Sequence, residues 1–342
     1  MVYIKNTLYM TIKHLHTLFA LIIFNLAFCP GVYCQTAADS IYVAKYKGDK
    51  QCAISYTFDD AHLEHYTLVF PKFEKLGFKA TFWVNGKTIE DYEKGLPNHT
   101  PRASWKHLKI MAEHGHEISN HGWSHKNLVN FPLEEGRVDI ERNDSAILAN
   151  IGELPLTYCY PNNSKSPEAI KMASANRIGT RTKQLQVGSN STTENLNYRI
   201  DSLLTNREWE VVMIHGITIG YDAFKSDSIF WNHLDKVKTL ENKIWVATFR
   251  DVAAYTAEQQ NIKLETIQKG KKWIIKPVLT LDKKLFKYPL TMVLQQNGIR
   301  ELSVKQGQKQ LAVEILPDKA MFDFDPNGGE IIITTTVGSF ER

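Results

Sequence analysis

Cysteine is scarce in this chain, which has four among its 342 residues, at positions 29, 34, 52 and 159. Only Cys52 and Cys159 lie beyond the leader that we predict below. Two isolated thiols make neither a disulfide framework nor a cysteine-based zinc cluster. The fold must therefore rest on a hydrophobic core, for which a hydrophobic content of 43% is sufficient.

The chain also lacks a strong excess of charge of either sign. The net charge is +4, and the basic residues are scattered along the sequence. Proteins that bind nucleic acid usually carry a concentrated basic patch, so a nucleic-acid partner is not indicated. No internal repeat or low-complexity segment stands out. The length suggests one large domain, or one domain with a smaller one attached.

No apolar run is long enough to span a membrane comfortably. The apolar stretch Leu15–Phe28 is shorter than the about 20 residues that a transmembrane helix needs. Basic residues precede it, which is typical of a secretory signal peptide. We predict a signal peptide at residues 1–34 and an exported protein, whether periplasmic, at the cell surface or secreted, with no stable membrane span after cleavage. A retained anchor and a lipoprotein signal at Leu26–Cys29 are the alternatives.

Two kinds of apolar pattern alternate between about residues 40 and 255. Short runs of β-forming residues indicate strands, and longer amphipathic segments that end at glycine indicate helices. The predicted strands are 52–58, 80–84, 116–119, 211–214 and 244–248, and the predicted helices are 68–76, 105–113 and 133–151. This alternation predicts parallel βαβ units in an open sheet or a barrel.

The pattern changes after about residue 260. Apolar and polar residues alternate in short segments, with turn residues such as Asn297-Gly298 between them. The predicted strands are 273–281, 290–294, 302–304, 311–316 and 331–337. We therefore expect a domain at residues 40–258, followed at 262–342 by a small β-sandwich-like accessory domain. The latter contains no cluster of reactive side chains, which favours a structural or sugar-docking role.

Two adjacent carboxylates, Asp59 and Asp60, follow the first predicted strand. Parallel α/β folds gather active-site groups at the ends of their strands. Neighbouring side chains of an extended chain point to opposite faces, so one carboxylate can bind a metal while the other acts as a base. Taken alone, such a pair is more often a solvated turn or a helix cap.

Histidines mark two further segments. His121 and His125 are four residues apart, which predicts a helical turn on which both rings can hold one ion. Neutral imidazole is a good ligand for zinc and related divalent metals. His215 follows an apolar strand and would project into the same site. Taken singly, the pair could be two unrelated surface histidines, and His215 a core or strand-end histidine.

In this order and spacing, the segments resemble the polysaccharide deacetylase (NodB-homology) family, carbohydrate esterase family 4. Thr57–Asp60 is similar to the first motif of that family, and Met213–His215 is similar to the last. His121–His125 is similar to the second motif, with Gly122 in place of the usual serine or threonine. The resemblance covers about residues 50–256. The connecting segments that agree are 71–82, 115–121 and 248–255.

The resemblance implies a distorted (β/α) barrel of fewer than eight units, here followed by the small all-β domain. It also implies a divalent metal ion held by Asp60, His121 and His125. We expect zinc, with cobalt, nickel or manganese as alternatives. Asp59 would be the general base and His215 the general acid. The partner would be an acetylated polysaccharide or oligosaccharide, from which acetyl groups are removed.

Physical chemistry supports such a site independently. A divalent ion lowers the pKa of a bound water from about 15.7 toward 7. Three protein ligands leave a position open for that water and the substrate. Asp59 can take the proton of the water, and His215 can protonate the leaving amine. The ion and a backbone N–H can stabilise the oxyanion.

One segment departs from the family pattern. Cys159 stands where an arginine normally steadies the base, and Asn162 stands where a tyrosine lends its backbone N–H to the oxyanion hole. Since any residue but proline has that N–H, we expect Asn162 to provide it. An arginine beside a carboxylate lowers its pKa and fixes its orientation. We expect Arg181, on the next strand, to replace the lost arginine; a surface arginine is the alternative.

Four functions are compatible with these residues. The first is a metal-dependent deacetylase of N-acetylated sugars in chitin, peptidoglycan or a related glycan. An O-acetyl (xylan) esterase would use the same residues, and the altered third motif could instead belong to a catalytically impaired, glycan-binding pseudoenzyme. A glycosidase would need two acids about 5–10 Å apart across a sugar, which a metal in the cleft argues against.

Overall fold

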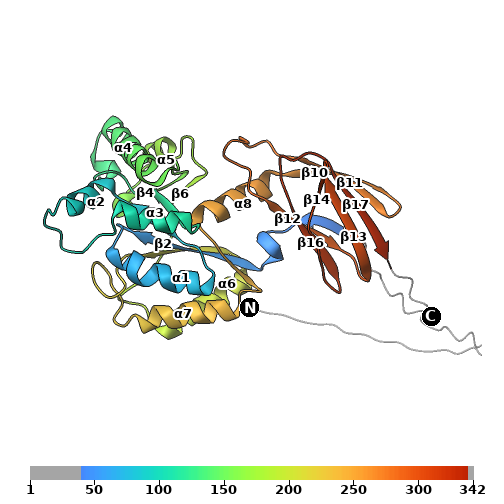
Figure 1. The fold of residues 1–342 in the computed structure, drawn as a ribbon, viewed down its shortest axis with the longest axis horizontal. Coiled ribbons are helices and arrows are strands. Elements are labelled where there is room, and N and C mark those ends of the chain that lie inside the picture. The colour runs from blue at the N-terminus through green and yellow to red at the C-terminus, as the bar shows by residue number, and fades with distance from the viewer. Residues whose placement is uncertain (1–39, 338–342) are drawn as a thin grey trace, which may run out of the picture. The chain divides into compact units, whose positions relative to one another are not determined.

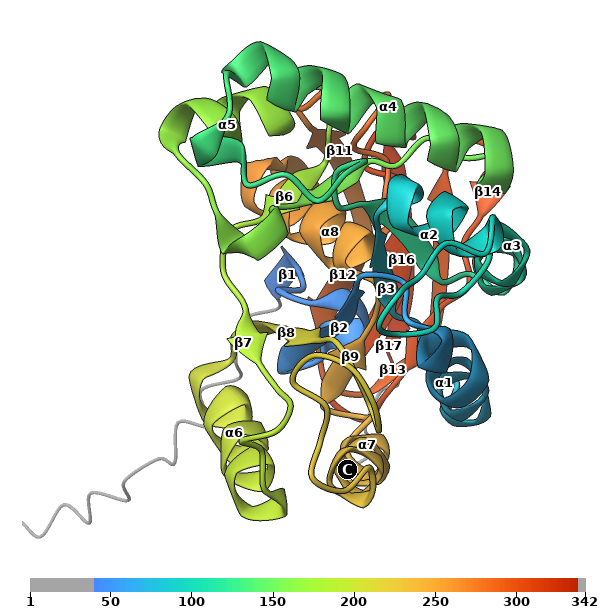
Figure 2. The same ribbon diagram turned by 90° about the vertical axis from the view of Figure 1, so that its left-hand side faces the viewer.

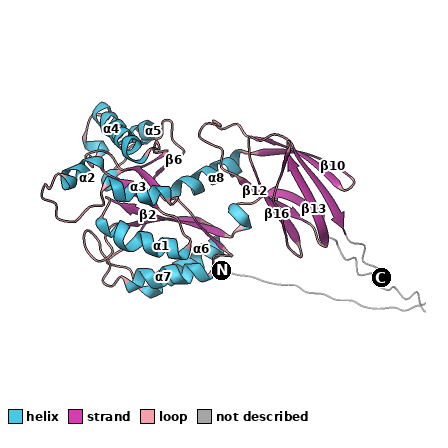
Figure 3. Ribbon diagram, viewed as in Figure 1, coloured by secondary structure: helices cyan, strands magenta, loops and turns pink. Residues whose placement is uncertain are grey.

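The computed structural model describes residues 40–337, whereas residues 1–39 and 338–342 lie outside its described part (Figure 1). The leader predicted at 1–34 is therefore not covered. Helices are found between residues 47 and 261, and the described residues after 261 form strands and loops (Figure 3). None of the described helices is long and apolar enough to span a membrane.

A curled parallel sheet forms the interior of the first part, with helices around it (Figure 2). Its strands follow the order β6-β5-β4-β3-β2-β8-β7, and β9 pairs with β2. Every pairing is parallel, and none joins β6 to β7 within residues 40–337. The predicted distorted barrel of fewer than eight units is thus confirmed. The strands are β2 (Cys52–Asp59), β3 (Thr81–Val84), β4 (Glu117–Asn120), β5 (Thr157–Cys159), β6 (Gly179–Arg181), β7 (Leu185–Gln186), β8 (Trp209–Ile214) and β9 (Ile244–Val246).

Helices follow most of these strands, and their ends obey local rules. Helix α3 begins at the capping box of Ser104 and His107, in which each side chain accepts the backbone N–H of the other residue. Helix α1 ends at Gly77, whose φ of 71° favours glycine. The helices are η1 (Lys47–Asp49), η2 (His65–Val69), α1 (Phe70–Leu76), α2 (Gly86–Glu93), α3 (Trp105–Glu113), η3 (Leu128–Asn130), α4 (Leu133–Ile151), η4 (Pro161–Asn163), α5 (Pro167–Ala173), α6 (Thr193–Asn206), α7 (Ser228–Thr239) and α8 (Phe249–Asn261).

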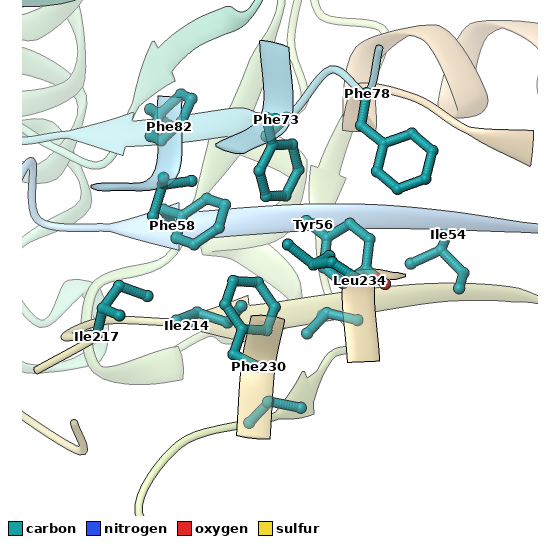
Figure 4. Close-up of a cluster of buried hydrophobic side chains, with 14 of the residues drawn as sticks. Ile54, Tyr56, Phe58, Phe73, Phe78, Phe82, Ile214, Ile217, Phe230 and Leu234 are labelled. Atoms are coloured by element: carbon teal, nitrogen blue, oxygen red, sulfur yellow. The ribbon is translucent and has the colours of Figure 1, made fainter. Parts of the chain in front are cut away.

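Strand β2 divides its side chains between a hydrophobic core and the future site. Tyr56 and Phe58 point into a buried aromatic cluster with side chains from α1, β3 and α7 (Figure 4). The rings of Phe58 and Phe82 stack with centroids 5.2 Å apart. Because strand side chains alternate, Thr57 and Asp59 face the other side. Core packing on one face therefore fixes the direction of the carboxylate on the other.

The remaining strands form two antiparallel sheets, which confirms the predicted small all-β domain. One sheet has the order β1-β12-β16-β15, and the other β10-β11-β17-β13-β14. The predicted strand 311–316 is wrong as a continuous strand, since only Glu314–Ile315 of it is extended and paired. Of these strands, β1, β10, β14 and β16 were not predicted. The strands are β1 (Ser40–Val43), β10 (Lys263–Lys269), β11 (Lys272–Val278), β12 (Leu290–Gln295), β13 (Ile299–Gln306), β14 (Lys309–Gln310), β15 (Glu314–Ile315), β16 (Lys319–Phe324) and β17 (Ile331–Val337).

Helix α8 brings a buried carboxyl group beside the chain that leads into β12. Glu258 has an exposed fraction of 0%, and its Oε1 accepts the backbone N–H of Tyr288 at 2.9 Å. Its Oε2 is buried without a hydrogen-bond partner in the described part of the chain. Burial raises the pKa of Glu258 from 4.5 to about 7.

This burial predicts a pH-dependent stability that Glu258→Gln should remove. The stabilising contribution of protonated Glu258 is complete below its unfolded-state pKa of about 4.5, and it is lost as the pH rises through about 7. The unfolding free energy of Glu258→Gln, relative to wild type, should rise across this window by up to about 3 kcal/mol and then stay constant. Denaturant unfolding from pH 4 to 9 measures it, with the exposed Glu265→Gln as control. A constant difference across the window would contradict this assignment.

Candidate metal and catalytic site

A cavity of about 460 Å³ opens at the carboxyl ends of the parallel strands. Asp59 ends β2, Arg181 ends β6, and His215 directly follows β8. All seven residues that sequence analysis selected line this cavity. The lining consists of Asp59, Asp60, His121, His125, Tyr160, Asn162, Asn163, Arg181, Gln184, Gln186, Met213, His215 and Tyr221.

Asp60, His121 and His125 converge on a common point. Asp60 Oδ1 lies 3.7 Å from His121 Nε2 and 3.5 Å from His125 Nε2. One ligand atom from each of the three lies within 4.8 Å of the other two. One carboxylate and two imidazoles are a donor set that zinc and related divalent ions accept.

Hydrogen bonding and burial prepare His121 as a neutral ligand. Its Nδ1 donates to the carbonyl oxygen of Cys159 at 2.9 Å, which leaves the lone pair on Nε2, the atom nearest Asp60. Burial lowers the pKa of His121 to about 4, although Asp59 and Asp60 oppose this shift. His121 is therefore neutral at pH 7, and the residues present fit a metal ion.

The two histidines do not share a helical turn, so that prediction is wrong. The segment is a loop after β4 in which Gly122 has a φ of 74° and His125 a φ of 55°. A Cβ on Gly122 would lie 2.9 Å from Asp139 Oδ2. Asp139 also accepts the N–H and hydroxyl of Ser124. The loop, held by Asp139, turns both rings toward Asp60.

A buried ion pair with Arg181 holds Asp59, the other of the two adjacent aspartates, in place. Arg181 Nη1 donates to Asp59 Oδ1 at 2.8 Å, and Nη2 donates to Oδ2 at 2.5 Å. Arg181 also donates to the hydroxyl of Thr57 at 2.7 Å. Burial alone would favour a neutral carboxyl group, but the adjacent guanidinium outweighs it and lowers the pKa of Asp59 to about 2. Arg181 thus occupies the position that we expected of a replacement arginine, and Asp59 is ionised.

A second group of possible ligands, which sequence analysis did not identify, consists of Asp59, His121 and Cys159. Cys159 Sγ lies 4.0 Å from Asp59 Oδ2. However, both oxygens of Asp59 are bound by Arg181. Burial raises the pKa of the Cys159 thiol well above its usual range, and a neutral thiol is a poor ligand. The group that contains Asp60 is therefore the better metal site.

His215 approaches the same carboxylate from β8. Its Nε2 lies 3.9 Å from Asp59 Oδ2, and its backbone oxygen accepts a hydrogen bond from His65 Nε2 at 2.8 Å. Its Nδ1 is buried and has no hydrogen-bond partner among residues 40–337. Nε2 is thus the ring atom that can exchange a proton with a bound molecule.

Asn162 lies in η4, beside β5, with a φ of 54°. Asn163 has a φ of 52°, and both residues line the cavity. The left-handed backbone is one that asparagine tolerates better than most residues. The role of the Asn162 N–H in an oxyanion hole stays a prediction.

Sequence analysis missed several wall residues. Gln184 lies between β6 and β7, Gln186 ends β7 and Tyr221 follows β8, and all three line the cavity. None of them belongs to a periodic pattern or a metal-binding motif, so the sequence carried little signal for them. His62 and His65, which follow Asp60 closely in the sequence, are buried, and neither belongs to a candidate ligand group among the described residues.

Comparison with known proteins relates the site to one family. A family model described as polysaccharide deacetylase matches residues 46–181, which include both aspartates, both loop histidines and Arg181 but not His215. The protein YxkH of Bacillus subtilis (strain 168), named after the same family, is 23% identical over 134 residues. This match covers 39% of the chain and 45% of YxkH, so the chain spans less than half of that relative.

Two solved structures are also similar. A family 4 acetyl xylan esterase from Clostridium thermocellum, in complex with a cobalt ion, is 22% identical with a TM-score of 0.44. That match covers 58% of this chain and 89% of the esterase. A CE4 family pseudoenzyme from Bacillus anthracis is 16% identical with a TM-score of 0.44, and the match covers 60% and 66% of the two chains.

The metal site predicts the behaviour of three alanine variants. Asp60→Ala, His121→Ala and His125→Ala should each lower zinc affinity by more than about 100-fold, because changes beyond the ligands already cost about 10–100-fold. Calorimetric titration and metal analysis after dialysis measure this, with the exposed His99→Ala as control. Wild-type zinc affinity in all three variants, with folding verified by circular dichroism, would show that the ion binds elsewhere.

Proposed function

We propose that this chain is a metal-dependent hydrolase that removes acetyl groups from N-acetylated sugars of a polysaccharide, and the match of residues 46–181 to the polysaccharide deacetylase family model supports this proposal. One observation carries the proposal. A fitting set of metal ligands, an ionised carboxylate and the imidazole of His215 meet in a single cavity. Amide hydrolysis needs these three functions together.

Asp60, His121 and His125 would hold the ion, and we propose zinc, with cobalt, nickel or manganese as alternatives. Such an ion, when bound, lowers the pKa of a water molecule toward 7 and polarises a carbonyl group. The three ligands follow strands β2 and β4, which lie on either side of β3 in the parallel sheet. Their rigid support favours a constant geometry.

Asp59 would accept the proton of the attacking water. Its Oδ2 lies 3.9 Å from His121 Nε2 and 3.9 Å from His215 Nε2, so it stands between the metal ligands and the proposed acid. Arg181 keeps this carboxylate ionised and in one orientation. A backbone N–H at Asn162, which lines the same cavity, would bind the developing oxyanion.

His215 would donate a proton to the leaving group through Nε2. An amine is a poor leaving group, so this donation matters more for N-acetyl than for O-acetyl substrates. An O-acetyl (xylan) esterase is the alternative that uses the same residues. The pseudoenzyme alternative is less favoured, because Arg181 supplies the guanidinium that the altered third motif lacks. Residues 1–34 support export, so the substrate would be an extracellular or periplasmic glycan.

Asp59→Asn tests the proposal most simply. The amide keeps the shape of the side chain but cannot take a proton, so kcat should fall by about 10²–10⁴ while zinc affinity is retained. Acetate release from chitin oligomers, peptidoglycan fragments and acetyl-xylan should be measured, with chelator and after zinc is restored. Full activity of Asp59→Asn would refute the base assignment. Acetate release from acetyl-xylan alone would favour the esterase.

Arg181 offers a second test, with pH as the readout. In Arg181→Lys, the planar guanidinium that binds both carboxylate oxygens of Asp59 is lost, and the pKa of Asp59 should rise. The acidic limb of the kcat profile should move to higher pH, kcat at pH 7 should fall, and the zinc content should stay the same. Arg181→Ala should have a larger effect and also destabilise the fold, because it leaves a buried charge unpaired. An unchanged acidic limb in Arg181→Lys would contradict this role.

A further inference from the structure

The segment of residues 216–221, which we term the platform loop, directly follows His215 and is held by a buried carboxylate. Glu64 accepts the backbone N–H groups of Ile217 at 2.9 Å, Thr218 at 3.0 Å and Ile219 at 3.3 Å. It also accepts the Thr218 hydroxyl. One buried side chain thus satisfies three consecutive backbone donors. Charge-assisted bonds of this kind are stronger than neutral ones, so the loop has a defined conformation.

Close packing adds two further constraints to the platform loop. The N–H of Gly216 donates to the carbonyl oxygen of Tyr221 at 3.1 Å and closes the loop on itself. At Gly220, where φ is 95°, an added Cβ would lie 2.6 Å from Cε1 of the buried His62. The loop therefore rests on the turn that follows the metal-binding Asp60 and cannot shift freely.

This rigid support presents one aromatic side chain to the cavity. Tyr221 lines the cavity, and its ring meets that of His215 edge to face at 5.0 Å. Yet 66% of Tyr221 is exposed. Tyr198 is similarly exposed at 74%, but it lies on α6 and does not line this cavity. What distinguishes Tyr221 is its position on an anchored loop, beside the proposed acid.

Four further residues of the wall carry uncharged amide side chains. Asn162, Asn163, Gln184 and Gln186 face the cavity, and amide groups both donate and accept hydrogen bonds. The Oε1 atom of Gln184 is buried and has no hydrogen-bond partner within the described part of the chain. Such a wall suits hydroxyl and N-acetyl groups rather than a charged ligand.

We propose that the platform loop presents Tyr221 as a stacking surface for a neutral pyranose ring of the polymer, adjacent to the sugar that loses its acetyl group. The apolar C–H face of the sugar would lie on the tyrosine ring, while its hydroxyl groups meet the amide wall. This inference rests on the proposed function for the identity of the reacting sugar. Tyr221 and Glu64 then determine affinity for the chain and not the chemistry.

The test measures binding separately from catalysis. Calorimetry with zinc-loaded Asp59→Asn protein, which we expect to bind without turnover, gives the affinity for an N-acetylated chitin pentamer. Adding Tyr221→Ala should weaken binding about tenfold, the change that corresponds to about 1.4 kcal/mol. Tyr221→Phe keeps the ring and should stay within about twofold, as should the control Tyr198→Ala. Glu64→Ala should weaken binding as Tyr221→Ala does.

Kinetics with otherwise unaltered protein complete the test. Tyr221→Ala should raise KM for the pentamer about tenfold with a smaller change in kcat, whereas a merely structural role would alter stability and leave KM in place. Unchanged affinity and KM in Tyr221→Ala, with acetate still released, would overturn the platform and leave the proposed function intact. If the pentamer binds in a way that depends on Tyr221 but the wild-type protein releases no acetate, the proposed function is wrong and the stacking role of Tyr221 stands. Absence of pentamer binding by every protein would overturn the platform.

Discussion

The buried ion pair between Asp59 and Arg181 is the interaction on which the site depends. It joins β2 to β6, and both partners are nearly inaccessible to water. A lone carboxylate at this depth would be costly, and burial would tend to protonate it. With the guanidinium bound to both oxygens, the carboxylate is ionised and fixed between His121 and His215. The remaining functional groups are arranged around that fixed charge.

The candidate metal ligands show a second consequence of burial. Low dielectric surroundings keep His121 neutral, and the carbonyl oxygen of Cys159 orients its ring. The same burial keeps the Cys159 thiol protonated, which separates the two overlapping groups of possible ligands. Burial therefore has opposite consequences for neighbouring side chains. It prepares an imidazole as a ligand and removes a thiol from competition.

Much of this arrangement could be predicted from the sequence, for reasons that particular residues make clear. The predicted α3 and α4 agree with the structure, because their amphipathic runs end at glycines. Strand β10 escaped prediction because nearly all its side chains are exposed, so no apolar alternation marks it. Arg181 was expected because Cys159 stands in place of the arginine that would otherwise pair with the base, Asp59. The conformation of the 121–125 loop could not be predicted, since it depends on Asp139, which is distant in sequence. Glu64 acts through a contact with Ile217, 153 residues further along the chain, for which the local sequence holds no signal.

The central claim is that one cation binds to Asp60, His121 and His125 beside an ionised Asp59. The most direct measurement is anomalous diffraction at the zinc edge from crystals grown with zinc. The account predicts one strong peak about 2.0–2.2 Å from an oxygen of Asp60 and the Nε2 atoms of both histidines, with Asp59 still bound to Arg181. A peak between Asp59, His121 and Cys159, or no peak in this cavity, would contradict it.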